Sequence, residues 1–481
     1  MKNLFCLCFC FFSLIDTRAT PNILLIISED NGPELGCYGE PFVKTPNLDR
    51  LAEEGILFEN AYVPQAGCSQ SRASLLTGLY PHQNGQIGLA TWKFRMYSKR
   101  TPNLISVFKQ FGYRTGIIGK LHVNPEEAFP FDFKKIPSAN FSRKNLEEYS
   151  QFAEEFINAS EMPFFLSVNY PDPHRPFLRQ VNKLPPMPLT SEDVKPLGYF
   201  GLDHQALRED TANYYNSLSR LDSLIGDLLS ALDHSGKSKN TIVVYLGDHG
   251  ADMLRGKRTS YEGGLKIPLI IRCPEIVRPN RSVRELTSTI DLFPTFLDIV
   301  GIKPEFKLPG RSLMPLIKNR EIAWREYIFT EYHTHSAHNY YPQRTIRNNR
   351  FKLILNLQPN EINPGYEFTK SKFYVDLDEI INEAPEHIKN AYVLMEKPPE
   401  FQLYDLHTDP FEFKNLAESS EHKGILALLK EQLNLWRHKT KDPLLNIANV
   451  KALKREINAC KINGKYKKNR LQLNYDKYFF E

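Results

Sequence analysis

Cysteine and long hydrophobic runs are both scarce in this sequence of 481 residues. Three of its seven cysteines lie within the first 19 residues, which leaves Cys37, Cys68, Cys273 and Cys460 for the rest of the chain. Four cysteines form at most two disulfides, so a small disulfide-stapled scaffold is excluded. The one long apolar run is at the N-terminus, which excludes a protein that crosses a membrane several times.

The chain also lacks a strong excess of one charge. It has 61 Lys and Arg against 56 Asp and Glu, a formal net charge of +5. A dedicated nucleic-acid-binding protein is usually more basic and has its charges clustered, so no nucleic-acid partner is expected. With 31 Phe, 23 Tyr and 3 Trp, the chain has enough aromatic side chains to fill a large core, which excludes disorder as its main state.

The first 19 residues have the pattern of a secretory signal. Lys2 gives a charged start, an apolar run follows at 4–15, and Thr17 and Ala19 are acceptable small residues before a cleavage site. The run is shorter than the roughly 20 residues that a membrane-spanning helix needs. We therefore predict a cleaved signal peptide at 1–19, no stable membrane insertion afterwards, and a secreted or periplasmic protein, or a lysosomal one in an animal host.

Strand-like and helix-like segments alternate in the first two thirds of the chain. Helices are predicted at 46–55 and 208–232. This alternation indicates an α/β fold with a mainly parallel sheet, in which ligands bind at the carboxyl ends of the strands. The predicted buried strands are 22–28, 114–119, 164–170, 241–246 and 268–272.

The pattern changes after about residue 320 and predicts a smaller α+β domain. A surface excursion rich in Pro, Asn and acids is expected at 359–399, and a solvated Lys-rich face at 451–468. The predicted domains are the signal at 1–19, a catalytic domain at 20–320 and a C-terminal domain at 321–481. Within the last of these, strands are predicted at 325–331, 345–357 and 402–406, and a closing helix at 424–437.

Carboxylates follow two of the predicted strands. Glu29 and Asp30 come directly after 22–28, and adjacent buried carboxylates are costly unless they are paired, hydrogen-bonded or bound to a metal. Asp248 and His249 follow 241–246, and such a pair fits a metal site. Taken alone, the first pair is better explained as capping or turn acids, and the structural alternative for the second pair is a turn.

Cys68 begins a helical pattern, where the helix N-terminus provides a positive field. Arg72, four residues later, can reach back over it. Lys120 and His122 are two residues apart, which places both on one face of an extended segment. The structural alternatives are a buried, inert cysteine and a chance basic pair at a strand end.

Two further residues are candidates for the same site. His174 lies between two prolines after the strand 164–170, so it is a rigidly placed candidate acid or base. Lys257 follows the Asp248-His249 pair. Each signal is weak by itself, and the specific observation is their joint occurrence in this order.

The two longest motifs resemble the signatures of type I, formylglycine-dependent sulfatases. The family has C-x-P-S-R-x-x-L-L-T-G, and this chain has CSQSRASLLTG at 68–78; the family also has G-Y-x-T-x-x-x-G-K-x-H, and this chain has GYRTGIIGKLH at 112–122. The stretch 403–417 is similar to the family's C-terminal pattern. Within the family, the stretches 71–89, 114–133, 172–177 and 436–443 are most similar to the N-sulfoglucosamine sulfohydrolase (heparan sulfamidase) branch.

The resemblance implies an alkaline-phosphatase-like fold, with a large mixed, mainly parallel sheet between helices and a smaller C-terminal antiparallel sheet. It implies that a maturation enzyme oxidises Cys68 to Cα-formylglycine, whose hydrate attacks sulfur in a sulfated saccharide. Arg72 and Lys120 would stabilise formylglycine and the sulfate oxygens, and Lys257 would contact the sulfate and assist as an acid. His122 would act as base and His174 as acid. The implied ligands of one Ca²⁺ are Glu29, Asp30, Asp248, His249 and residue 68.

Four positions depart from the family pattern. Gln70 replaces the signature proline that the formylglycine-generating enzyme usually reads. Glu29, His249 and Lys257 stand where the sulfamidase branch has Asp, Asn and Arg. The loop 90–100 is this chain's own; its cations, either substrate-binding or merely solvated, are Lys93, Arg95, Lys99 and Arg100.

The preferred hypothesis is therefore a sulfamidase-like enzyme that acts at the end of a saccharide chain. Three alternatives to it remain open. One is an O-sulfatase acting on a glycosaminoglycan or an algal polysaccharide. Another is a two-zinc phosphatase or phosphodiesterase on the same architecture, which the cysteine at position 68 disfavours. The last is a non-catalytic binder of sulfated glycans, which follows if Gln70 prevents the conversion of Cys68.

Overall fold

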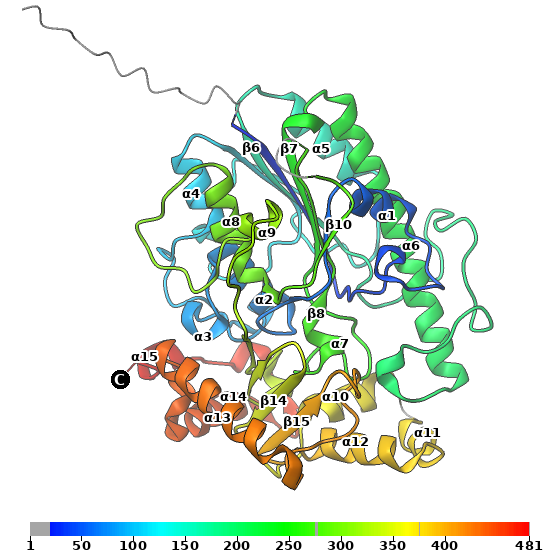
Figure 1. Cartoon of the computed structure of the whole chain (residues 1–481), viewed down its shortest axis with the longest axis vertical. Coiled ribbons are helices and arrows are strands. Elements are labelled where there is room, and N and C mark those ends of the chain that lie inside the picture. The colour runs from blue at the N-terminus through cyan, green and yellow to red at the C-terminus, as the bar shows by residue number, and fades with distance from the viewer. Residues whose placement is uncertain (1–19, 275–277, 375, 481) are drawn as a thin grey trace, which may run out of the picture.

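The main sheet has eight strands in the order β10-β2-β9-β7-β1-β6-β4-β5. Figure 1 labels three of them, β6, β7 and β10. The computed structural model describes residues 20–274, 278–374 and 376–480, so the predicted signal peptide lies outside the described residues. The strands are β1 (Asn22–Ser28), β2 (Ile56–Phe58), β4 (Arg114–Gly119), β5 (Phe133–Lys135), β6 (Phe164–Tyr170), β7 (Thr241–Gly247), β9 (Leu269–Arg272) and β10 (Arg281–Val283). A small sheet beside it contains β3 (Ala61–Tyr62), β8 (Lys266–Ile267) and β11 (Thr287–Ser288).

The sheet is mixed but mainly parallel, as predicted. β1 pairs in parallel with β6 and β7, and β4 with β5 and β6. β9 is antiparallel to both of its neighbours, β2 and β7. The five strands predicted from apolar runs all form, each within one residue of its expected bounds.

Helices cover both faces of the sheet (Figure 1). Along β1, Leu24 and Ile26 face one hydrophobic cluster, and Ile23, Leu25 and Ile27 face the other. Because side chains alternate along a strand, a strand that is apolar throughout must be covered on both sides. One face packs against α1 (Pro46–Glu53), α5 (Glu148–Asn158) and α6 (Gln205–His234), and the other against α2 (Cys68–Thr77), α4 (Leu104–Gln110) and α8 (Leu292–Ile299).

The C-terminal part contains a four-stranded antiparallel sheet in the order β12-β13-β14-β15. The predicted single strand at 345–357 was wrong, because Asn348, Asn349 and Arg350 form a turn that divides it in two. The strands are β12 (Ile328–Tyr332), β13 (Gln343–Arg347), β14 (Phe351–Asn356) and β15 (Phe401–Asp405). The predicted closing helix forms as α13 (Lys423–Lys439) and packs on this sheet.

The predicted surface excursion at 359–399 was also wrong, because this segment forms α10 (Pro364–Phe373), α11 (Leu377–Asn382) and α12 (Glu386–Glu396). Its Asn and Pro are helix-start residues: the Asn363 side chain accepts a hydrogen bond from Gly365 N, and Pro364 is the first helical residue. Buried Tyr392 and Met395 join the same hydrophobic cluster as α6. The helices therefore help to cover the main domain.

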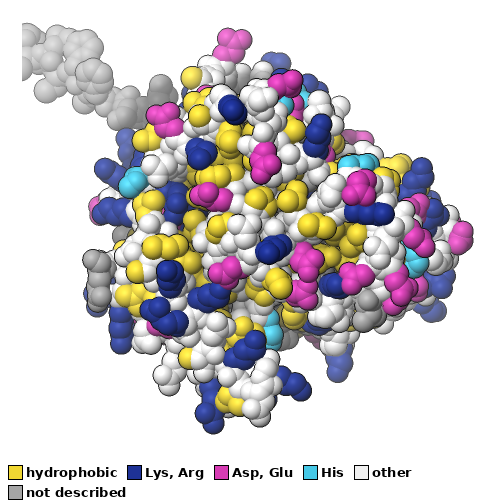
Figure 2. Space-filling model, turned by 90° about the horizontal axis from the view of Figure 1, so that it is seen from below, with side chains coloured by type: hydrophobic (Ala, Val, Ile, Leu, Met, Phe, Trp, Pro, Cys, Tyr) yellow, Lys and Arg dark blue, Asp and Glu magenta, His cyan; other side chains and the backbone are white. Residues whose placement is uncertain are grey.

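The remaining elements are short or lie at the C-terminal end. The Lys-rich segment 451–468, expected as a solvated face, contains most of α14 (Ile447–Ala459) and the hairpin of β16 (Lys461–Ile462) and β17 (Lys465–Tyr466). It buries Leu453 and Ile457. No helix in the described ranges has the length and apolarity needed to cross a membrane. Seen from below, basic and acidic side chains are interspersed over the surface (Figure 2). The other short helices are α3 (Pro81–Asn84), α7 (Glu262–Leu265), α9 (Met314–Ile317) and α15 (Tyr475–Tyr478).

Candidate active site

Four adjacent parallel strands, β7-β1-β6-β4, end at the same edge of the main sheet. Ser28, the last residue of β1, lies opposite Gly247 of β7 and Tyr170 of β6, and Gly119 of β4 lies opposite Asn169 of β6. The loops that follow these strand ends therefore converge. They carry the predicted residues Glu29, Asp30, Lys120, His122, His174, Asp248 and His249.

Glu29, Asp30 and Asp248 form a group of buried carboxylates at this edge. Asp30 N donates to Asp248 Oδ1 over 2.8 Å, which places the two loops against each other. Although burial raises the pKa of Glu29, the nearby charges of Arg72 and Lys120 outweigh it and hold the pKa at about 2. The carboxylate is therefore ionised at any ordinary pH.

Cys68 is the first residue of α2, as predicted, and its side chain is buried beside these acids. Its Sγ lies 3.3 Å from His249 Nε2 and 3.9 Å from Asp30 Oδ1. Burial raises the pKa of the Cys68 thiol to about 12, although Lys120 and Lys257 act in the opposite direction. An unmodified thiol at this position is neutral, so it is a poor nucleophile.

Three cations balance the three carboxylates. Lys257 Nζ lies 2.8 and 2.9 Å from the two oxygens of Asp30, and Lys120 Nζ lies 2.7 Å from Glu29 Oε2. Arg72 bonds to Glu29 over 2.5 Å and to Asp248 over 3.1 Å. Because every nitrogen of the Arg72 guanidinium makes a hydrogen bond, including Nη1 to Asn169 Oδ1 and to the Lys120 carbonyl, this side chain holds the acidic groups in place.

The two predicted histidines flank this charged group. The His174 ring stacks on Phe141 with 3.8 Å between ring centroids, and its Nε2 lies 3.7 Å from Asp30 Oδ2. Neither ring nitrogen of His122 has a hydrogen-bond partner among the described residues. Burial, assisted by the charge of Lys120, holds the pKa of His122 well below its ordinary range, so this imidazole is neutral and free to accept a proton.

The prediction that Lys120 and His122 share one face of an extended segment was wrong, although both residues lie near the site. β4 ends at Gly119, so neither residue belongs to an extended strand. His122 has a positive φ of 60°, and a turn of the loop brings its ring toward the charged group. Two-residue alternation therefore does not explain their shared direction.

Three residues that support the site were not predicted from the sequence. Asn169 accepts a hydrogen bond from Arg72, and buried Asp172 binds Arg143 and Arg220, which fixes the loop that carries His174. His335 faces the site from the segment after β12; its Nε2 has no partner in the described structure, and burial followed by the charges of Lys257 and Arg258 lowers its pKa. No local motif marks His335, because only the packing of the second sheet brings it here.

Two features peculiar to this sequence have structural roles. The Gln70 side chain donates to the Thr334 carbonyl over 2.6 Å, which links α2 to the segment after β12. Substrate contacts considered for Lys93 and Arg95 do not fit the structure, because both residues hold the C-terminal tail. Lys93 donates to the Asn469 and Leu471 carbonyls, and Arg95 to Asp476 and the Leu473 carbonyl.

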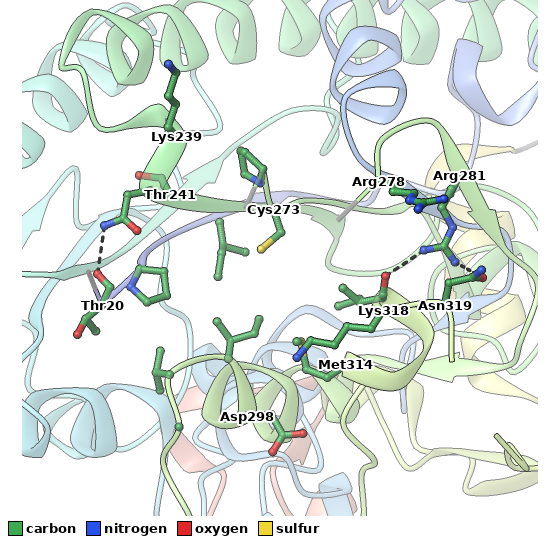
Figure 3. A pocket seen from close by; sticks show the side chains of 18 residues that line it. Thr20, Lys239, Thr241, Cys273, Arg278, Arg281, Asp298, Met314, Lys318 and Asn319 are labelled. Carbon is green, nitrogen blue, oxygen red and sulfur yellow. Dashed lines mark hydrogen bonds between the residues drawn. The ribbon is translucent and has the colours of Figure 1, made fainter. Parts of the chain in front are cut away.

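A large cavity lies elsewhere in the described part of the chain (Figure 3). It has a volume of about 880 Å³ and is lined by Thr20 just before β1, Thr241 at the start of β7 and Cys273 just after antiparallel β9. These positions are at the opposite edge of the sheet from Cys68. The cavity is therefore separate from the charged group described above.

The donor set fits a divalent cation. Ligand atoms of Asp30, Cys68 and His249 lie within 4.8 Å of one another, and so do those of Glu29, Cys68 and Asp248. Carboxylate oxygens are the donors that hard divalent ions prefer. In the structure, the Lys257 ammonium compensates Asp30, as an ion would.

Comparisons with known proteins agree with this geometry. The sulfatase family matches residues 21–302, and the family described as N-sulphoglucosamine sulphohydrolase, C-terminal, matches 247–387. Human N-sulphoglucosamine sulphohydrolase is 31% identical over 475 residues, covering 89% of this chain and 92% of the relative. An ulvan-active sulfatase of Formosa agariphila is 28% identical over 423 residues, covering 86% and 80%.

Solved structures agree on the fold. A putative sulfatase from Bacteroides thetaiotaomicron has a TM-score of 0.68 at 22% identity, covering 89% of this chain and 94% of its own. A structure described as a complex with its substrate D-glucosamine-2-N,6-O-disulfate has a TM-score of 0.64 at 22% identity, covering 88% and 99%. The predicted alkaline-phosphatase-like fold is confirmed. The chain therefore belongs to the sulfatase family, whose members are sulfuric ester hydrolases that use a formylglycine residue and a divalent metal ion.

Proposed function

We propose that this protein is a secreted sulfatase that removes sulfate from the end of a sulfated saccharide, with N-sulfoglucosamine as the preferred sugar. The observation that carries the proposal is the burial of Cys68 beside three carboxylates and three cations at the carboxyl edge of the sheet. A tetrahedral anion needs positive charge on several sides, and this edge supplies it. The predicted signal at 1–19 supports secretion, to the periplasm or, in an animal, the lysosome.

Each side chain has a role that its surroundings support. Lys120 and Lys257 bind sulfate oxygens, and Arg72 keeps Glu29 and Asp248 in position. Neutral, unpartnered His122 accepts a proton from residue 68. His174, held by its stacking on Phe141, is placed to give a proton to the departing amine or alcohol once it is protonated; without substrate, burial followed by the charges of Lys257 and Lys120 holds its pKa well below the ordinary range.

Converted to formylglycine, residue 68 would attack sulfur with one hydroxyl of its hydrate while the bond from sulfur to the amine or alcohol breaks; loss of the second hydroxyl's proton to His122 would then expel sulfate and restore the aldehyde. A metal held by the carboxylates would supply positive charge to the sulfate oxygens.

The N-sulfate preference is supported by the human relative and by the second family match at 247–387. The ulvan-active relative supports the alternative, an O-sulfatase acting on a polysaccharide. Purified enzyme should release sulfate, measured by ion chromatography, from glucosamine N-sulfate and leave glucosamine 6-O-sulfate unchanged. Release from the 6-O-sulfate alone would replace this proposal with the O-sulfatase alternative.

We further propose that the metal is a single Ca²⁺ held by Glu29, Asp30, Asp248, His249 and residue 68. An ion that binds only the folded state raises stability by about 2.7 kcal/mol at 100 times its Kd. Adding Ca²⁺ to chelator-treated protein should therefore raise the unfolding temperature, and elemental analysis should find one Ca²⁺ per chain. Asp30→Asn should lose this Ca²⁺-dependent rise, while Asp203→Asn, on the exposed surface, should keep it. An equal rise in both variants would contradict the ligand set.

Gln70 supports one candidate from another class, a sulfated-glycan binder with an unconverted thiol. Gln70 stands where the family signature has proline, and the buried Cys68 thiol is a poor nucleophile. Such a protein would keep the cations that bind sulfate and lack turnover. The chemical state of residue 68 separates the two candidates.

A further inference from the structure

Helix α10 brings a cluster of aromatic and cationic side chains against the candidate site. Arg258, the residue after Lys257, has its guanidinium 5.3 Å from the centre of the Phe368 ring and 5.9 Å from that of Phe373. Lys372 Nζ lies 5.0 Å from the centres of the same two rings. We call Arg175, Arg258, Phe368, Lys372 and Phe373 the outer cluster; Arg175 lies 4.4 Å from the Phe373 ring centre.

A short series of contacts joins the outer cluster to the sulfate-binding group. Lys257, which binds Asp30, lies 3.9 Å from Asp252, and Asp252 forms an ion pair with Arg258. Arg175, the residue after His174, donates to the Asp252 carbonyl over 2.7 Å. Arg175 and Arg258 are thus the chain neighbours of the proposed acid His174 and of the proposed sulfate ligand Lys257.

Lys372 is the member of the cluster whose charge is not compensated. Arg175 is paired with Asp210, and Arg258 with Asp252, whereas Lys372 has no ion pair within the described structure. The Lys372 side chain is exposed to solvent, and its partial desolvation, together with the charges of Arg258, Lys257 and Arg175, still lowers its pKa, while Asp252 has the opposite effect. Lys370, two residues earlier, forms an ion pair with Asp378 over 2.6 Å. An unpaired cation placed among other cations is stabilised by an anion that arrives with the substrate.

We propose that Lys372 binds a second anionic group of the saccharide, a carboxylate or a further sulfate, while Phe368 and Phe373 form an apolar platform for the sugar ring. This inference rests on the proposed function and specifies its substrate: a saccharide with at least two negative charges. Lys372 is then a specificity-determining residue that takes no part in the chemical step. A flexible ammonium accepts either anion, because it binds as a point charge.

The test compares Lys372→Ala with wild type on three substrates: glucosamine N-sulfate, glucosamine N,6-O-disulfate, and N-sulfoglucosamine linked to a uronic acid. The variant should lose about fivefold to tenfold in kcat/KM, through KM, on a substrate with the second anion, and should be unchanged on the monosulfated sugar. The disulfate and the uronic acid show which anion Lys372 recognises. Raising the salt concentration should weaken the wild-type preference for the doubly charged substrate and leave the variant unaffected.

Lys370→Ala is the matched control on the same helix and should match wild type on all three substrates, and Lys372→Arg should keep most of the preference. An equal loss on all substrates, or no loss on any, would overturn the inference. If wild type releases no sulfate from any substrate, the proposed function fails instead. Calorimetric binding of glucosamine N-sulfate and of the disulfate to wild type and Lys372→Ala then still decides the role of Lys372.

Discussion

Replacing Cys68 with alanine should abolish sulfate release, with a loss in kcat on the order of 10⁶, the size of effect that removal of a covalent nucleophile has. The fold should be unchanged, because alanine is favoured in helices and Cys68 is the first residue of α2. Its neighbours Asp30 and His249 keep their other partners, Lys257 and the Gly250 carbonyl. Sulfate release and the unfolding temperature, measured together, separate a loss of chemistry from a loss of structure.

The wild-type peptide that contains Cys68 should carry formylglycine when the protein is produced together with a formylglycine-generating enzyme, as read by mass spectrometry. Cys37→Ala is the matched control, since Cys37 is a half-buried thiol outside the charged group, and its activity should be close to wild type. Turnover that persists in Cys68→Ala would refute the proposed nucleophile. An unmodified thiol together with absent turnover would favour the glycan-binding alternative that Gln70 suggests.

Replacing Asp442 with asparagine should destabilise the protein by about 3–5 kcal/mol, the cost of removing one partner from a buried ion pair. Asp442 receives two hydrogen bonds from Arg344 of β13, at 2.9 and 2.6 Å, and one from Arg437 of α13 at 2.7 Å. Arg344 lies 3.7 Å from Glu331 of β12, which in turn binds His82 of α3. The pair therefore anchors the C-terminal sheet to the part of the chain that follows α2.

The destabilisation should depend on pH in a defined direction. Burial raises the pKa of Asp442, but Arg344 outweighs it and holds the pKa well below the ordinary value. A carboxyl group with a depressed folded-state pKa stabilises the protein above its unfolded pKa of about 3.9, and this contribution is lost as the pH falls further. The difference in unfolding free energy between wild type and Asp442→Asn should thus be full at pH 7 and shrink below about pH 4.

Denaturant unfolding at several pH values measures this difference. Asp203→Asn is the control, because Asp203 and Arg208 form an exposed pair, and such pairs contribute little. A pH-independent difference between wild type and Asp442→Asn would show that packing, and not charge, accounts for the role of Asp442. A change as large in Asp203→Asn would show that burial of the ion pair does not account for the effect.

The sequence predicted more of the main sheet than of the C-terminal part. Apolar runs such as 22–28 are unambiguous because strands covered on both faces contain few polar residues. The turn at Asn348 was missed because apolar residues continue on both sides of it. The helices α10 to α12 were missed because residues such as Asn363 and Pro364 were interpreted as loop residues. In the structure they begin helices. The proposed domain boundary near residue 320 falls before β12, the first strand of the second sheet.

By itself, the sequence determined the fold class, the family resemblance and the order in which Glu29, Asp30, Cys68, Lys120 and Asp248 follow their strands or begin their helix. Sequence motifs show this order because each motif is a short stretch of chain at the end of one strand or the start of one helix. Tertiary structure alone decided that His335 and Lys372 lie beside that group, and that Lys93 and Arg95 bind the tail. Those contacts join segments far apart in the chain, and no spacing of neighbouring residues encodes how two packed layers meet.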